Sequence, residues 1–96
     1  MTTKEFTNQL RLVADWTDAH DAGNKISGAY PGAPVPMVFL KSFEAMRELF
    51  AGRDATRTRD RHRSGYDWSI TVDGIVFRAA EYGAEPVSYD PETRVL

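Results

Sequence analysis

Apolar residues alternate on both sides of the dipeptide Asp73-Gly74, which predicts a β-hairpin over residues 66–82. A two-residue type I′ turn needs φ > 0 at both central positions, and Asp-Gly is well suited to it. This turn sets the cross-strand pairs as Val72–Ile75, Ile70–Phe77, Trp68–Ala79 and Tyr66–Glu81. Side chains alternate along a strand, so one face of the hairpin is apolar. That face consists of Trp68, Ile70, Val72, Ile75, Phe77 and Ala79.

Two segments carry the 3.6-residue hydrophobic period of a helix. The first runs from Thr2, a candidate N-cap with Glu5 three residues later, to about residue 22. Its apolar face includes Phe6, Leu10, Val13 and Trp16. The second helix is predicted from Phe43 to about residue 51, with Ser42 as its cap and Gly52 as its end. Its buried stripe is Phe43, Met46, Leu49 and Phe50. Between the helices, residues 35–40 are apolar and of strand length.

These elements predict an α+β fold in the order α-β-α-β-β. A small antiparallel sheet, built on the hairpin 66–82 plus one or two further strands, is covered on one face by two helices. The first helix is expected to supply most of that cover. Residues 1–96 form a single domain, residues 23–36 a long Pro/Gly loop and residues 83–96 a loosely held tail.

Composition limits the classes of protein to which the chain can belong. Its 96 residues, 42% hydrophobic and 27% charged, are typical of one globular domain without membrane spans. No apolar run approaches the roughly 20 residues of a membrane helix, and the first residues lack a secretory signal pattern. We therefore expect a cytoplasmic protein. It has no cysteine, which excludes disulfides and thiol chemistry.

Catalytic motifs are lacking in the sequence. There are two histidines, and neither a GxGxxG nor a GxxxxGKS phosphate loop occurs. Asp18, His20 and Asp21 cluster at a helix end, but Asp18 and His20 point in different directions, which is unfavourable for metal binding. We therefore expect no enzyme, no metal and no cofactor. Tyr30, in the Pro/Gly loop, is a candidate exposed anchor for a partner, although a loop tyrosine folded over the core is more common.

Charge is distributed unevenly along the chain. Residues 53–63 hold five arginines against two aspartates, whereas the rest of the chain is net acidic. In a strand, the alternating arginines would place guanidinium groups about 6–7 Å apart on one face. An acidic protein surface is one candidate partner, and nucleic acid is an alternative, with Tyr66 stacking on a base. A charged edge that blocks sheet aggregation is the third interpretation. The candidate partner-binding residues are Arg57, Arg59, Arg61, Arg63, Tyr66 and Tyr30.

The chain also resembles small accessory proteins of actinobacteria and their phages. The similarity lies in residues 10–20 (LRLVADWTDAH), the strand and short helix that end at Gly52, and residues 72–79 (VDGIVFRA). The resemblance implies an α+β domain of about this size, and it identifies no functional residue. Phage accessory proteins of this size often bind and inhibit one host factor. We therefore expect a non-catalytic protein-binding module, with a host protein that has an acidic surface as its partner.

Overall fold

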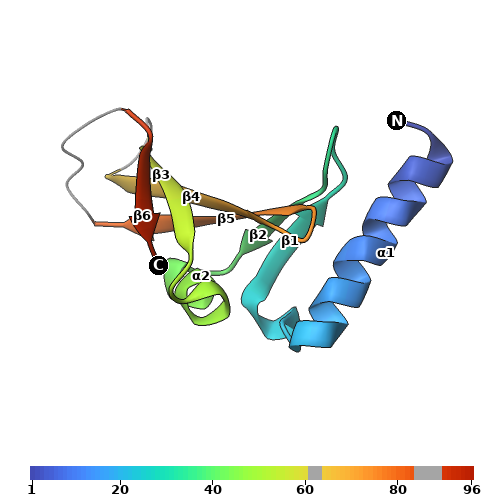
Figure 1. The fold of residues 1–96 in the computed structure, drawn as a ribbon, viewed down its shortest axis with the longest axis horizontal. Helices are drawn as coiled ribbons and strands as arrows, with labels where there is room; N and C mark the ends of the chain where they lie inside the picture. Colours follow the sequence, from blue (N-terminus) through green and yellow to red (C-terminus); the bar gives the residue numbers. More distant parts are fainter. Residues whose placement is uncertain (61–63, 84–89) are drawn as a thin grey trace.

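A six-stranded mixed sheet forms the centre of the fold (Figure 1). The computed structural model describes residues 1–60, 64–83 and 90–96. In chain order the elements are α1 (Thr3–His20), a short 3₁₀ turn (Gly23–Lys25), β1 (Ile26–Tyr30), β2 (Met37–Leu40), α2 (Phe43–Phe50), β3 (Asp54–Arg59), β4 (Gly65–Val72), β5 (Ile75–Tyr82) and β6 (Glu92–Val95). The strands lie in the order β1-β2-β5-β4-β3-β6, and β2–β5 is the parallel pair.

The hairpin of β4 and β5 has the predicted register. Val72 pairs with Ile75, and the pairing continues residue by residue to Gly65 and Tyr82. Asp73 and Gly74 have φ of 53° and 79°, as the type I′ turn requires. All six residues of the predicted apolar face are buried, so this prediction is confirmed.

The predicted fold class is wrong in the size, the pairing and the order of the sheet. The described residues form four further strands beyond the hairpin, and their elements follow the order α-β-β-α-β-β-β-β. Residues 26–30, expected within a loop, form the edge strand β1, where a bulge between Ile26 and Gly28 accommodates the irregular sequence. At the other end, β3 and β6 pair with each other although neither has an apolar face. Backbone hydrogen bonds pair these polar strands, and the hydrophobic pattern of the sequence does not predict such pairing.

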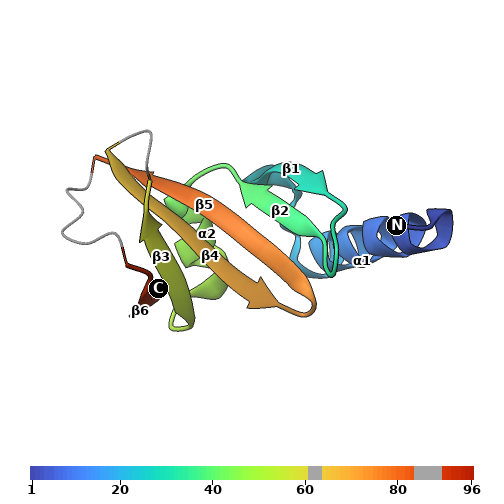
Figure 2. The same cartoon turned by 90° about the horizontal axis from the view of Figure 1, so that it is seen from above.

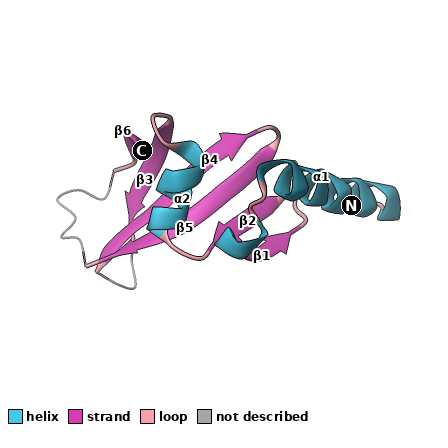
Figure 3. Cartoon of the chain, turned by 90° about the horizontal axis from the view of Figure 1, so that it is seen from below, coloured by secondary structure: helices cyan, strands magenta, loops and turns pink. Residues whose placement is uncertain are grey.

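The predicted helix cover is also wrong for α1. Both helices lie on one side of the sheet, but α2 lies over its centre while α1 stands at one end (Figure 3). Met46 and Phe50 of α2 are buried in the core together with Phe77. In α1 only Val13 and Trp16 are buried, and Phe6 and Leu10 are 46% and 41% exposed. In the described part of the chain, no helix lies over the opposite face of the sheet (Figure 2).

Polar contacts attach α1 to the end of the sheet. Its start is capped as predicted, because the Thr2 hydroxyl accepts a hydrogen bond from the Glu5 amide. Farther along, the Gln9 side chain exchanges two hydrogen bonds with the backbone of Gly32. The Trp16 indole donates to a carboxylate oxygen of Asp73. The helix is therefore held by its middle and its C-terminal half.

The C-terminal residues are paired over part of the segment that was expected to be loosely held. Glu92–Val95 form β6 beside β3, and Leu96 exchanges backbone hydrogen bonds with Gly52 and Arg53. Residues 84–89 of that expected tail lie outside the described part of the chain.

Candidate functional site

The first part of the arginine segment lies inside the sheet rather than at its edge. Arg57 and Arg59 belong to β3, which is flanked by β4 and by the edge strand β6. The interpretation of this segment as an edge strand is therefore wrong as far as Arg57, because β6 pairs with residues 54–57. Thr58 and Arg59 pair with β4 beyond the end of β6. Arg61 and Arg63 lie outside the described residues.

Arg57 has a carboxylate partner within the protein. Its Nη2 and Nε atoms lie 2.9 and 3.0 Å from Oε2 of Glu92 on the neighbouring strand. Its guanidinium also stacks over the ring of Tyr66, at 4.2 Å from the ring centroid. Hydrogen bonding from Arg57 lowers the pKa of Glu92, and Arg94 adds to the effect. Tyr66 is only 6% exposed. The structure thus brings Arg57 and Tyr66 together as an internal contact, away from the exposed Tyr30.

Tyr30 is 58% exposed on the helix-free face of the sheet, where its ring contacts another aromatic side chain. Its ring meets Phe39 of β2 edge to face, with centroids 5.6 Å apart. The guanidinium of Arg78, on β5, lies over the Phe39 ring, 5.6 Å from its centroid. Nη1 of Arg78 is 4.0 Å from the sulfur of Met37. Strand alternation explains the cluster, because these residues occupy outward positions on three neighbouring strands.

Two cations on this side of the molecule lack ion-pair partners in the described part of the chain. No carboxylate of the described residues lies within 4.0 Å of the charged atoms of Arg78 or Lys41. Arg78 is half-buried and stacked, so its orientation is already restricted. A guanidinium held in this way can bind a carboxylate with little loss of side-chain freedom.

The same face is hollowed at the point where β2 ends. Two adjoining concavities of about 420 and 400 Å³ share Phe39, Ala79, Ala80 and Tyr82 as lining residues. The first also includes Tyr30 and Lys41. The second also includes Arg78, Asp60 and Asp67. Small alanine side chains between aromatic ones leave this space open.

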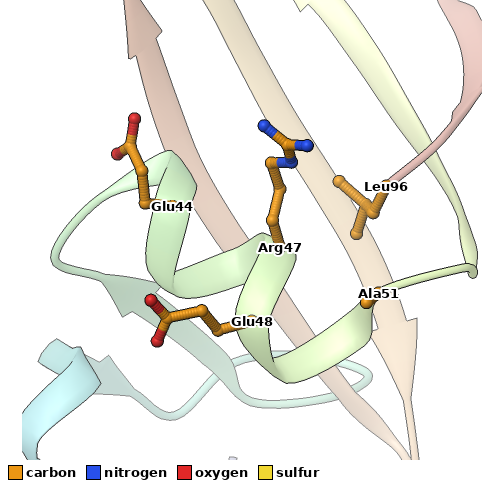
Figure 4. Close-up of a pocket in the computed structure, with 5 residues that line it drawn as sticks. All are labelled: Glu44, Arg47, Glu48, Ala51 and Leu96. Atoms are coloured by element: carbon orange, nitrogen blue, oxygen red, sulfur yellow. The ribbon is translucent and has the colours of Figure 1, made fainter.

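A separate hollow of about 310 Å³ lies between α2 and the C-terminal residue, lined by Glu44, Arg47, Glu48, Ala51 and Leu96. Arg47 and Leu96 stand on opposite sides of it, while Glu44 and Glu48 project from the helix away from Leu96 (Figure 4). Glu48 is engaged by Lys25, whose Nζ lies 3.5 Å from its carboxylate. These exposed, mixed charges suit a solvated helix surface.

His20, the histidine near the candidate metal-binding aspartates, contacts Trp16 of its own helix. Its ring stacks on Trp16 with centroids 4.0 Å apart, and Nδ1 lies 2.8 Å from the Trp16 carbonyl oxygen. Within residues 1–60, 64–83 and 90–96, no group of three or more His, Asp or Glu residues could hold a metal ion. Neither helix in this part of the chain has the length and apolar character needed to cross a membrane.

Sequence reasoning identified Tyr30 but missed Phe39, Arg78 and Lys41. The available signal was the outward face of the hairpin, on which Arg78 follows Val76 and precedes Ala80 at strand spacing. A cation between apolar neighbours on that face is unusual for a surface that meets only water. Comparison with known proteins brought no match among family models, curated proteins or solved structures.

Proposed function

We propose that this chain is a non-catalytic protein-binding module that acts by occupying, and thereby inhibiting, one partner protein. The single observation that carries the proposal is the Arg78 guanidinium, stacked on Phe39 beside the exposed Tyr30 on a sheet face without helices. Arginine and aromatic residues are the side chains most enriched at the centres of protein interfaces.

Arg78 and Lys41 are the features of this face that favour an acidic partner, although Asp60 and Asp67 line the hollow next to Arg78. Arg78 and Lys41 have no carboxylate within ion-pair distance among the described residues, so a partner can supply one. Arg57, in contrast, already binds Glu92 and has less to gain. We therefore propose that the cationic part of the partner site lies on β5 and at the end of β2, and not on β3.

Nucleic acid is the second candidate, because Tyr30 and Phe39 lie on an uncovered sheet face where bases could stack. The acidic net charge of −2 disfavours it. A fluorescence-anisotropy titration with labelled single-stranded oligonucleotides at low salt separates the two candidates. The protein-binding proposal predicts no saturable binding, whereas nucleic-acid binding would weaken steeply as salt is added.

Selection from a random dodecapeptide library, with the folded protein immobilised, tests the proposal. We expect enriched peptides that contain Asp or Glu and that lose at least about tenfold in affinity with Arg78→Ala or Tyr30→Ala. Arg11→Ala is the matched control, since this exposed arginine lies on α1. Failure to enrich any peptide, or equal loss with the control, would contradict the proposal.

A further inference from the structure

Strand β5 is longer than the strand that covers one of its sides. On one side β4 pairs with all of it, from Ile75 to Tyr82. On the other side the pairing with β2 covers only Val76 to Arg78. The register of this pair places Leu40, the last residue of β2, level with Ala79, and among the described residues no strand follows it beside Ala80. The last three residues of β5, about 10 Å of strand, thus extend beyond the end of β2 as an open stretch of edge in the described part of the chain.

The backbone of Ala80 faces this open stretch. Val76 donates its N–H to the carbonyl of Pro36, at the start of β2, with N and O 3.0 Å apart. Backbone polar groups point to alternate sides along a strand, so those of Ala80 point to the same side as those of Val76. Ala79 lies one residue before Ala80, and its backbone groups point toward β4. An added strand could therefore use the N–H and C=O of Ala80 without breaking the existing pairing.

Space for a strand is present on both faces of this edge. The concavities of about 420 and 400 Å³ lie on the helix-free face, and another of about 390 Å³ lies toward α2. Ala80 and Tyr82 line all three, so the hollows surround one segment of backbone. An incoming strand lies about 4.8 Å from its neighbour and directs side chains alternately to both faces. The three concavities have the arrangement that such a strand needs.

The start of α2 creates the open stretch. Lys41 is still held beside β1, because its N–H donates to the carbonyl of Lys25 at 2.8 Å. The next residue, Ser42, caps α2 by accepting a hydrogen bond from the Ala45 amide at 3.0 Å. Strand β2 therefore ends at Leu40, level with Ala79, while β5 continues for three more residues.

We propose that an extended segment of the partner protein adds to the sheet as a short strand that pairs with the backbone of Ala80, in line with β2. This inference rests on the proposed protein-binding function. The segment carries an acidic side chain toward Lys41, which is the charged residue of the concavity that also contains Tyr30. Its alternate side chains enter the hollow next to α2, whose lining includes Phe43, Arg47 and the carboxylates Glu44 and Glu81. Backbone pairing supplies affinity, and the two sets of side-chain hollows supply specificity.

Backbone N-methylation of a peptide selected from the dodecapeptide library tests the strand pairing directly. Each amide is methylated in turn, which removes one N–H donor and leaves every side chain in place. We expect binding to be lost by at least about tenfold at alternate amides of the paired stretch and to be kept at those between them. A peptide that tolerates every methylation, yet still depends on Arg78, would refute strand addition and leave the proposed function standing. Absence of any selected peptide would refute both.

Ala80→Pro provides the complementary change in the protein. Proline removes the N–H that faces the open edge, while the hydrogen bonds to β4 remain. We expect it to abolish peptide binding, whereas Ala80→Ser, which keeps the N–H, binds the peptide. Circular dichroism verifies that both variants fold, and the methylated peptides decide the matter if the proline variant does not.

A charge reversal tests the acidic side chain, and sedimentation tests a second copy of the chain as the occupant. Lys41→Glu should weaken binding of the selected peptide at least about tenfold. Changing the acidic residue of the peptide to lysine should restore binding to this variant. Lys4→Glu, on the exposed start of α1, should change neither. If the protein sediments as a dimer that Ala80→Pro dissociates, the edge is occupied by a second copy, which contradicts a partner segment.

Discussion

The indole N–H of Trp16 donates a hydrogen bond to the Asp73 carboxylate across 3.2 Å, joining α1 to the turn of the β4–β5 hairpin. The same tryptophan packs on Phe77, with ring centroids 4.6 Å apart, so its ring belongs to the core while its N–H reaches the surface. Asp73 thus has two roles, since its backbone also adopts the left-handed conformation of the turn. The position of α1 therefore combines this hydrogen bond with the burial of Val13 and Trp16.

Removing the donor or the charge of this pair should destabilise the protein. Trp16→Phe keeps an aromatic ring but loses the N–H, and Asp73→Asn keeps a residue that tolerates the left-handed turn. We expect a coupling free energy of about 1 kcal/mol in a double-mutant cycle of urea unfolding. Additive effects of the two substitutions would show that the hydrogen bond does not hold α1 in place.

The core beneath α2 should be sensitive to loss of volume at Phe77. This residue is fully buried and contacts Phe50 with centroids 4.9 Å apart. Phe77→Ala should lower the free energy of unfolding by about 3–5 kcal/mol, measured by urea denaturation. Val76→Ala, one residue earlier on the helix-free face, is the matched control and should cost about 1 kcal/mol or less. Equal costs would argue against the observed assignment of the two faces.

The exposed apolar residues of α1 should contribute little to stability. Phe6→Ser and Leu10→Ser each should change the free energy of unfolding by about 0.5 kcal/mol or less, because both side chains meet solvent. Val13→Ala, on the buried side of the same helix, should cost about 1–3 kcal/mol. Thermal melts of the three variants provide the measurement. A large loss at Phe6 would mean that α1 covers the sheet after all.

The Arg57–Glu92 pair should make the free energy of unfolding depend on pH in the acidic range. The folded pKa of Glu92 lies below its usual 4.5, mainly because Arg57 hydrogen-bonds to the carboxylate. A lowered pKa means that the stabilising contribution is complete above about pH 4.5 and is lost as the pH falls through the folded pKa. In a double-mutant cycle with Arg57→Ala and Glu92→Gln, the coupling should be constant from neutral pH to about pH 5 and should vanish below.

Salt provides the control for this pair, because both side chains retain some contact with solvent. Adding salt at neutral pH should reduce the coupling, as screening weakens partly exposed ion pairs. A coupling that persists at low pH would contradict the assignment of the effect to the ionised carboxylate.

The parts of the fold that follow from local sequence could be predicted. The Asp73-Gly74 turn determines its hairpin, and Thr2 and Ser42 determine where the helices begin. Strands β1, β3 and β6 could not be predicted from hydrophobic pattern, because their stability comes from backbone pairing with residues distant in the chain. The amphipathic pattern of α1 likewise indicates a helix without saying how much of its apolar face is buried.

The candidate site was predictable only in part, for a related reason. Tyr30 was identified from its position among prolines and glycines, and it is exposed. The arginines were candidates because five of them lie within residues 53–63. Arg57, however, is neutralised by Glu92, which lies 35 residues later in the chain. Arg78 could not be identified from the sequence, because its contact with Phe39 joins two residues that are 39 positions apart and lie on the neighbouring strands β5 and β2.

Titration of the isotopically labelled protein with a selected peptide, followed by amide chemical shifts, tests the central claim most directly. We expect the largest shifts in residues 37–41 and 78–82, around the open edge of β5 and the face that holds Tyr30 and Arg78. Shifts concentrated instead on the exposed side of α1, around Phe6 and Leu10, or on β3 around Arg57, would contradict this account.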